Sequence, residues 1–463
     1  MLQSGVCIMA LWLGLTSGSS AGGAEPDLKV TVGQESPRPG PFLGVGYHAF
    51  FPVHARQTTP EIERLLHQRW KELNPSFARV THQWGWNVEH AARQLAMMKQ
   101  AGTSVYLTTW DPEAAETPEA RDAYAARVAD LLKDLVVTRK LDNIRWYCMT
   151  NELSLPSGWG AMYKDLPRFE DYHRRIFKAL QERRLSVALL ATDASPADRW
   201  DSIRWAVEHL DEVTGAYGGH HYINKHPPED ATFYGWFHDQ VQPMAALAHD
   251  KGKPFLIGEF GPKQHQGPRD GFQRWDGCAY FDTPQEPLAA LQTTEAVMAA
   301  VNGGADAIAY WTFADFPDDY DASKKYANKW GTFRWDGKEF PRRSGYYAIG
   351  LLTRNFRGPA SVYQTTAPAD LRALAIRSRD DGLYRVAVLN RRAEAVRVTV
   401  RIEGLDAAAT WQARLYNPKD AEAYQREGPL LNPKNLLAVE GSARVTVPAQ
   451  SLAVLIQSAP KAP

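Results

Sequence analysis

The sequence predicts a (β/α)8 barrel followed by a small antiparallel β-sandwich. Three observations support this fold class. The chain has 463 residues, eight short apolar runs alternate with helical patterns up to residue 311, and beyond residue 350 strand-like runs follow one another without helices. Apolar runs that alternate with amphipathic helices are typical of parallel strands joined by crossover helices, and eight such units fit one closed barrel. We expect the barrel at residues 41–350 and the sandwich at residues 351–463.

The apolar runs give the expected barrel strands, which are residues 42–47, 78–82, 104–109, 144–149, 186–191, 213–222, 254–260 and 305–311. Between them, residues 121–137 and 169–181 carry apolar side chains at the three- and four-residue spacing of helices that pack outside a barrel. A doubly wound open sheet is the alternative. It is less favoured because Gly44-Val45-Gly46 lacks the third glycine of a phosphate-binding loop. The expected sandwich strands are residues 371–378, 383–390, 396–402, 410–416, 444–447 and 452–457.

Residues 1–24 are typical of a secretory signal peptide. Residues 6–15 form an apolar core that is too short to cross a membrane, and small residues offer cleavage sites near residues 21–24. Because no Lys or Arg precedes this core, an uncleaved hydrophobic anchor is the alternative. We therefore expect a secreted or periplasmic protein with no membrane contact after signal removal. Residues 25–40 are expected to form an N-terminal extension with one strand-like run at residues 28–32.

Composition argues against several classes of partner and scaffold. Lys and Arg total 53, as do Asp and Glu, so no net charge would attract nucleic acid or an anionic membrane. The 15 Trp are unusually many, and their flat rings can stack on ligands as well as pack in a core. Beyond the signal, the chain keeps Cys148 and Cys278, which we expect to be free because a large core needs no disulfide. The oligomeric state is not indicated.

Two glutamates stand at the ends of expected barrel strands. Glu152 follows the fourth apolar run, and Glu259 ends the seventh. Active sites of (β/α)8 barrels are built at these strand ends. Two partly desolvated carboxyl groups there can be driven to different protonation states, as glycoside cleavage requires of its acid and its nucleophile. Because neighbouring strand residues point to opposite faces, Asn151 and Glu152 can both face a substrate only if the strand ends irregularly.

Asn-Glu at the end of strand four and Glu at the end of strand seven, 107 positions apart, resemble the pattern of clan A glycoside hydrolases, which are retaining enzymes. The resemblance implies Glu152 as the acid/base and Glu259 as the nucleophile. It further implies that Asn151 binds the sugar 2-hydroxyl and that Arg79, on strand two, orients the nucleophile. The resemblance covers the barrel, about two-thirds of the chain.

Other positions match the same pattern. His220 and Tyr222 end strand six, and Trp311 ends strand eight, where the resemblance implies a sugar-binding aromatic ring. A barrel followed by a sandwich is similar to family thirty-nine and to some family five enzymes. The sequence departs from many clan members in having Leu153, not Pro, after the motif glutamate.

Further candidates for substrate binding rest on position alone. Trp84 and Trp110 lie near expected strand ends, where a ring can stack on a sugar, although packing in the core is equally expected of a Trp. Asp111 and Asp193, just past strands three and five, could bind hydroxyl groups. Asp306 lies near the start of strand eight, on the face that serves stability.

A metal site is the main competing chemistry. His220 and His221 could converge with His48 or His82 at the barrel mouth, but the sequence has no His-Glu-x-x-His motif and no paired Cys, so we expect no metal. Outside the expected signal peptide, no Gly-x-Ser-x-Gly motif supports serine hydrolysis either.

The sequence therefore predicts a retaining glycoside hydrolase that acts on a carbohydrate substrate, with β-linked bonds preferred, and needs no cofactor. Its two carboxyl groups should lie about 5–5.5 Å apart. A carbohydrate-binding barrel without turnover and a transglycosylase with the same residues are the alternatives. Loops 261–287 and 313–343 are expected to shape the cleft.

Overall fold

The structure of the chain is a computed structural model. The structure describes residues 27–49, 59–82, 84–85, 87–109, 117–154, 165–223, 225–262, 264–269, 272–316, 326–336, 338–405, 409–420, 436–439 and 443–459. The expected signal peptide and the candidates Trp110 and Asp111 lie outside these residues.

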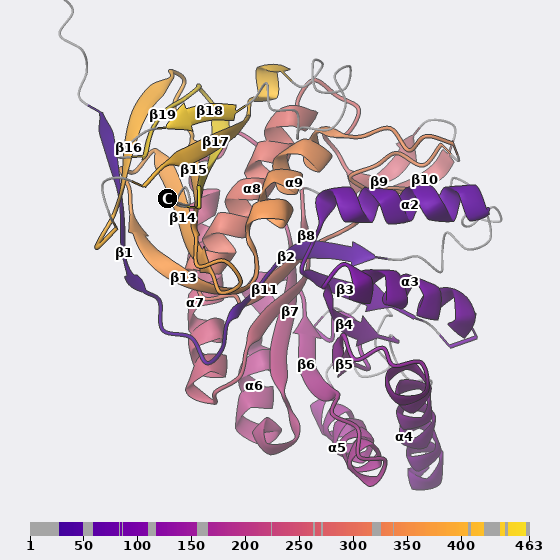
Figure 1. Ribbon diagram of the computed structural model, residues 1–463. Coiled ribbons are helices and arrows are strands. Elements are labelled where there is room, and N and C mark those ends of the chain that lie inside the picture. Colours follow the sequence, from indigo (N-terminus) through magenta and orange to yellow (C-terminus); the bar gives the residue numbers. More distant parts are fainter. Residues whose placement is uncertain are drawn as a thin grey trace, which may run out of the picture.

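Eight parallel strands close into a barrel (Figure 1). In chain order they are β2 (Phe42–Ala49), β3 (Phe77–Thr81), β4 (Ser104–Thr108), β5 (Ile144–Cys148), β6 (Ala188–Ala194), β7 (Ala216–Tyr222), β8 (Phe255–Gly261) and β11 (Ala307–Tyr310). Each pairs with the next, and β11 pairs with both β8 and β2, which closes the ring. Every one overlaps an apolar run identified in the sequence, so the predicted barrel is confirmed.

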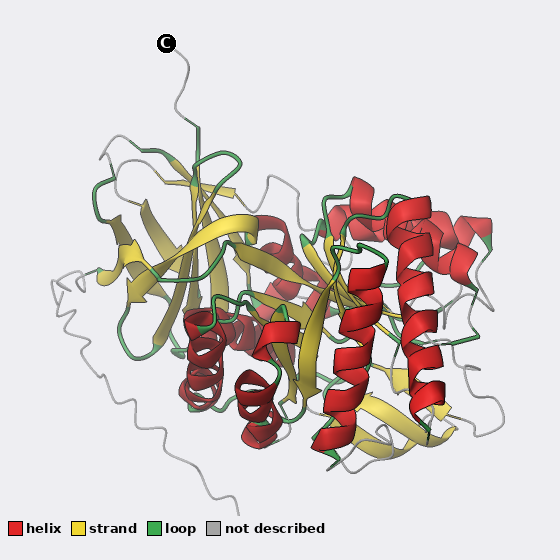
Figure 2. Ribbon diagram, turned by 90° about the horizontal axis from the view of Figure 1, so that it is seen from below, coloured by secondary structure: helices red, strands yellow, loops and turns green. Residues whose placement is uncertain are grey.

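Helices cover the outside of the barrel strands, as Figure 2 shows. They are α2 (Pro60–Leu73), α3 (Val88–Gln100), α4 (Pro118–Lys133), α5 (Leu166–Glu182), α6 (Asp201–His209), α7 (Phe233–Asp250), α8 (Glu286–Asn302) and α9 (Ser344–Asn355). The starts of α2 and α4 follow from sequence. Thr59 and Thr117 each accept a hydrogen bond from a backbone N–H of the first turn, and Pro follows each of them.

The strands that follow α9 form an antiparallel unit beside the barrel. They are β13 (Arg357–Thr366), β14 (Leu371–Ser378), β15 (Tyr384–Asn390), β16 (Val396–Ile402), β17 (Trp411–Tyr416), β18 (Leu436–Val439), β19 (Ala443–Val447) and β20 (Ser451–Gln457). The N-terminal strand β1 (Leu28–Glu35) pairs with β13 and β16, so the strand-like run near the N-terminus belongs to this unit.

The two units share a core. Strand β13 pairs with barrel strand β2, and one hydrophobic cluster includes barrel residues together with Leu374 and Leu452 of the sandwich. Helix α8 is buried along nearly its whole length, because barrel and sandwich cover opposite sides of it. The eighth barrel helix, α9, extends through residue 350 to Asn355.

The loops after the seventh and eighth barrel strands meet in a separate sheet. It consists of β9 (Gln264–Arg269), β10 (Phe272–Cys278) and β12 (Tyr326–Lys329), with β10 antiparallel to β9 and parallel to β12. These loops are the ones expected to shape the cleft. Within the described ranges, Cys148 and Cys278 are both free and buried, and no helix is long and apolar enough to span a membrane.

Candidate active site

Glu152 is held at the barrel mouth by an irregular strand end. Strand β5 stops at Cys148, and Glu152 has a left-handed backbone with φ of 54°. This change of direction brings both residues of the Asn-Glu pair to one side. Asn151 Oδ1 accepts a hydrogen bond from Arg79 Nη2 at 2.7 Å, while Glu152 Oε1 lies 3.6 Å from His220 Nδ1. The strand therefore ends irregularly, as it must if Asn151 and Glu152 are both to face a substrate.

Glu259 lies on β8 and is only 4% exposed. Arg79 donates a hydrogen bond to its Oε1, and Tyr222 donates one to its Oε2 at 2.5 Å. Burial alone would raise the pKa of Glu259, but the charges of His220 and Arg79 hold it well below its usual range. The group is an anion with both oxygens fixed, as a nucleophile requires.

Arg79 on β3 is fully buried and joins the elements around the site. Besides Glu259 and Asn151, it contacts Asp193 Oδ2 through Nη2 at 2.8 Å and His48 Nδ1 through Nη1 at 3.0 Å. A buried guanidinium keeps its charge only when carboxylates compensate it. Arg79 therefore fixes one oxygen of Glu259, and its role in orienting a nucleophile stays a prediction.

The two adjacent histidines on β7 face opposite ways. His220 points into the site, where Nδ1 lies 3.7 Å from Glu259 Oε2 and Nε2 lies 2.7 Å from Asp193 Oδ1. His221 points outward against the rings of Trp236 and Phe237 on α7. Burial opposes a charge on His220, but the neighbouring carboxylates raise its pKa to about 9. Burial lowers the pKa of His221 to about 3.

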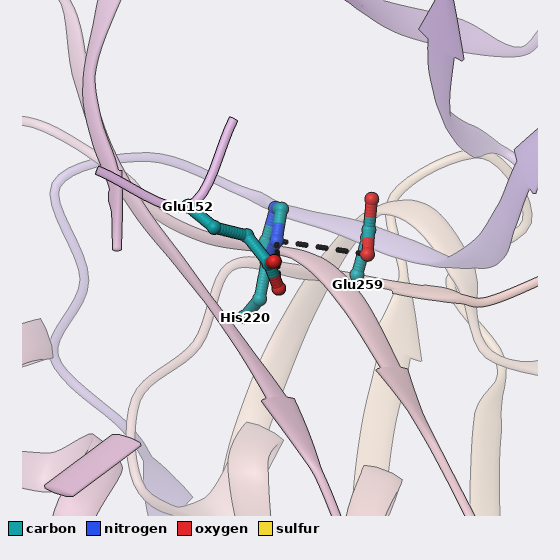
Figure 3. A group of neighbouring side chains, drawn as sticks. All are labelled: Glu152, His220 and Glu259. Atoms are coloured by element: carbon teal, nitrogen blue, oxygen red, sulfur yellow. Dashed lines mark ion pairs between the residues drawn. The ribbon is translucent and has the colours of Figure 1, made fainter. Parts of the chain in front are cut away.

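The two glutamates come close together beside His220 (Figure 3). One carboxylate oxygen of Glu152, one of Glu259 and a ring nitrogen of His220 all lie within 4.8 Å of one another. Figure 3 shows both carboxyl groups next to the imidazole ring.

Among the described residues, this trio is the one group of His, Cys, Asp and Glu with the spacing of a metal site. Its electrostatics fit a cation poorly. A histidine must be neutral at the nitrogen that binds a metal ion. The pKa of His220 is raised to about 9, and its Nε2 lies against Asp193 Oδ1. The Arg79 guanidinium also occupies Oε1 of Glu259 and would repel an incoming ion. The expectation that no metal is needed stays a prediction.

Asp193 differs from its expected role as a sugar-hydroxyl ligand. Its side chain is completely buried between Arg79 and His220, so a sugar cannot reach it. His48, which the sequence suggested only as a possible metal ligand, lies 3.1 Å from Glu259 Oε1 through Nδ1 and 2.8 Å from Thr81 Oγ1 through Nε2. Both residues stand at the ends of expected strands, and this position is the sequence signal that could have assigned them to the site.

The described tryptophan candidates divide between the site and the surrounding packing. Trp311 lies at the site, with its ring 4.5 Å from that of His48 and 8% of its surface exposed. Trp84 contacts Tyr124 and Arg127 of α4, which indicates a packing role. Asp306 is at the start of β11, paired with Arg38 at 3.0 Å, as its assignment to the stability face requires.

No family model and no curated protein sequence matches the chain. Solved structures do match. The catalytic domain of GH30 xylanase C from Talaromyces cellulolyticus is 12% identical over 93% of this chain and 100% of that chain, with a TM-score of 0.65. AbfB, a family 51 α-L-arabinofuranosidase from Bifidobacterium longum, is 12% identical over 93% and 99%, with a TM-score of 0.63. A monomeric β-xylosidase from Caulobacter crescentus CB15 is 14% identical over 94% and 100%, with a TM-score of 0.60.

At these identities the likeness concerns the fold. The chain has the fold of clan A glycoside hydrolases, the clan of families GH30 and GH51, and this confirms the fold that the resemblance implied. The families named for these solved structures are GH30 and GH51. Membership of family thirty-nine or family five stays a prediction.

Proposed function

We propose that the protein is a retaining glycoside hydrolase that cleaves O-glycosidic bonds in a poly- or oligosaccharide by double displacement. The observation that carries this proposal is the approach of Glu152 and Glu259, whose nearest carboxylate oxygens lie within 4.8 Å. Retaining enzymes hold their carboxyl groups about 5–5.5 Å apart, whereas inverting enzymes separate them by about 6.5–9.5 Å to admit a water. The spacing therefore favours the retaining mechanism.

In the first step, Glu259 attacks the anomeric carbon and the bond from that carbon to the leaving oxygen breaks. Glu152 gives its proton to that oxygen, so the leaving alcohol departs neutral and Glu152 becomes a carboxylate. Arg79 and Tyr222 fix the two oxygens of Glu259, which keeps the attacking lone pair directed at the sugar.

In the second step, a water molecule attacks the anomeric carbon of the glycosyl ester. Glu152 takes the proton of the water, the ester bond breaks and Glu259 returns as a carboxylate. Two inversions at one carbon retain its configuration.

Pentose-containing glycans are the first substrates to test, because the solved structures with this fold include xylanases, an arabinofuranosidase and a xylosidase. We propose β-linked bonds, in keeping with the sequence resemblance. We also propose action outside the cytoplasm, because residues 1–24 have the pattern of a signal peptide. N-terminal sequencing of the protein recovered from the culture medium or periplasm tests the last point.

The test of activity uses purified protein with xylan, arabinoxylan, β-glucans and aryl glycosides of xylose, arabinofuranose and glucose. Products are followed by mass spectrometry, and the anomeric configuration of the first product by NMR. Wild type should release sugars of retained configuration, and Glu259→Gln should not. The matched control is Asp306→Asn, which removes a buried carboxylate at the opposite end of the barrel and should keep activity.

Three outcomes would overturn the proposal. A wild-type protein that binds glycans without turnover supports the carbohydrate-binding barrel, and one that forms new glycosides at the expense of hydrolysis supports the transglycosylase. Full activity in Glu259→Gln would mean that another residue is the nucleophile.

A further inference from the structure

Asp193 touches both buried cations of the site and nothing accessible. Its Oδ2 lies 2.8 Å from Arg79 Nη2 and its Oδ1 lies 2.7 Å from His220 Nε2, and its side chain has no exposed surface. A carboxylate in this position cannot meet a substrate. Any influence on the reaction has to pass through its buried neighbours, which are Arg79, His220 and Tyr106.

The backbone of β6 is shaped to place this carboxylate. The register of β6 against β7 shifts between Thr192 and Ala194, and Asp193 between them has a left-handed φ of 57°. A non-glycine residue in this region is strained and persists where surrounding contacts enforce it. Bulges of this kind redirect a side chain beside an active site, which here turns Asp193 into the barrel interior.

The charges of the buried cluster balance only when Asp193 is counted. Arg79 and His220 carry two positive charges, and Glu259 alone supplies one negative charge. Without a second anion, burial would favour loss of the proton from His220, because an arginine cannot give up its charge. The charged and titratable groups of the described chain that face His220 are Asp193 from β6, Glu259 from β8, Glu152 after β5, Tyr106 from β4, Arg79 from β3 and His48 from β2.

We propose that Asp193 is a positioning residue that holds the Arg79 guanidinium against Glu259 and keeps the His220 imidazolium, protonated on both nitrogens, between Glu259 and Glu152. The proposal rests on the assignment of Glu152 and Glu259 to glycoside hydrolysis. It assigns Asp193 no contact with the sugar.

This arrangement serves both steps of the reaction. Before attack, the two cations stabilise Glu259 as an anion. Once Glu259 is esterified its charge is gone, and His220 Nδ1, 3.6 Å from Glu152 Oε1, then faces the carboxylate that Glu152 has become. A neutral His220 would stabilise the carboxylates of Glu259 and Glu152 less than an imidazolium does. Loss of the His220 proton should therefore slow both steps.

The experiment compares wild type with Asp193→Asn, which keeps the shape and removes the charge. Ring nitrogens of the histidines are observed by 15N NMR between pH 6 and 10, with His220→Gln to identify the signals of His220. In wild type His220 should be doubly protonated at pH 7.5. In Asp193→Asn it should be neutral at that pH, and the alkaline limb of the kcat profile should move down by at least about one pH unit.

Asp306→Asn is the matched control. Asp306 is also a buried carboxylate between an arginine and a histidine, 3.0 Å from Arg38 and 2.8 Å from His249, but it lies at the other end of the barrel. Its loss should lower Tm and leave both the His220 titration and the pH profile unchanged. A purely structural role for Asp193 would give the same result as the control.

The outcomes separate this proposal from the proposed function. A neutral His220 in wild type at pH 7.5 overturns the positioning role of Asp193. This measurement needs no variant, so it remains decisive if Asp193→Asn does not fold. An unchanged His220 in Asp193→Asn also overturns it, even if wild type is an active glycosidase. If His220 behaves as expected but wild type cleaves no glycan, the positioning role stands and the proposed function falls.

Discussion

His220 lies directly opposite Glu259 in the register of β7 and β8, and its Nδ1 lies 3.7 Å from Glu259 Oε2. The same nitrogen lies 3.6 Å from Glu152 Oε1, so one ring contacts both glutamates. A slip of β7 by one residue would turn His220 outward and place His221 in the site. The register that buries the aromatic contacts of His221 against α7 therefore also fixes the electrostatics of the site.

Stability should fall at alkaline pH because of His220. Its pKa in the folded protein is about 9, above the ordinary value of 6.5, so it stabilises the fold fully below 6.5 and loses that effect as the pH rises through 9. Between pH 7 and 9.5, urea unfolding of wild type should lose on the order of 2 kcal/mol more than that of His220→Gln.

Two comparisons make that measurement specific. Burial raises the pKa of the Cys148 and Cys278 thiols to about 12, which adds the same slope to both proteins. His173→Gln should keep the wild-type slope, because burial lowers the pKa of His173 to about 3 and the ring is neutral throughout this range. Equal slopes for wild type and His220→Gln would contradict a charged His220.

Removing the hydroxyl of Tyr222 should slow the reaction with little effect on folding. The hydroxyl donates to Glu259 Oε2 at 2.5 Å, and a hydrogen bond to a charged group contributes about 1.5–3 kcal/mol, so Tyr222→Phe should lower kcat/KM by roughly 10- to 100-fold. Tyr310→Phe removes another buried hydroxyl, which donates to the Trp330 carbonyl at 3.0 Å, and should change kcat/KM less than threefold. Equal kcat/KM values for the two variants would show that the Tyr222 hydroxyl has no specific role in the reaction.

The role of Glu152 as the acid can be tested by comparing substrates whose leaving groups differ in their need for a proton. Glu152→Ala should lower kcat about 10²–10⁴-fold on natural glycosides, whose alkoxide leaving groups need a proton. On dinitrophenyl glycosides the first step should survive, because that leaving group departs without protonation, and added azide should speed release as a glycosyl azide. An equal loss on both substrates would assign Glu152 a different role.

The ends of the apolar runs predict where part of this site lies. Most barrel strands are buried on both faces and form continuous apolar runs, so the end of such a run also marks the barrel mouth. That reasoning placed Glu259, whereas Arg79 was implied by the family resemblance. The structure brings Arg79, His220 and Tyr222 to the Glu259 carboxylate.

The pattern of apolar runs did not predict the positions of residues that depend on backbone irregularity or tertiary packing. Asp193 follows an apolar run as a hydroxyl ligand would, but a bulge buries it beneath the site, and a composition pattern does not reveal a bulge. Strand β13 begins with Arg-Gly-Pro and was not anticipated, although its pairing with β2 and β1 joins the barrel to the sandwich. Trp84 was a subsite candidate by position, and its partners on α4 depend on tertiary packing.

Gly258 should tolerate a side chain poorly, because residues of the site pack closely around it. A Cβ at this position would lie 3.0 Å from each of Arg79 Cδ, His220 Nε2 and Tyr106 Cε1. Gly258→Ala should therefore displace the buried cluster, cost about 1–3 kcal/mol in urea unfolding and lower kcat. Gly345→Ala on α9 is the control, because its new Cβ meets only ordinary contacts at 3.6 and 3.9 Å and should leave activity unchanged. Full activity in Gly258→Ala would show that the cluster can shift without consequence.

Glu295 should hold the sandwich to the barrel. It is fully buried on α8 and pairs with Arg372 Nε at 3.0 Å and Arg391 Nε at 3.7 Å, both from the sandwich. Glu295→Gln would leave two buried guanidinium groups without their anion, and breaking a buried pair from one side costs about 3–5 kcal/mol. We expect Tm to fall by several degrees while the kcat of the folded fraction stays at the wild-type value. Glu212→Gln, which breaks a solvent-exposed pair with Arg174, should change Tm little. If the two variants melt together, the ion pairs at this interface do not secure the sandwich, and its attachment rests on the shared hydrophobic core and the pairing of β13 with β2.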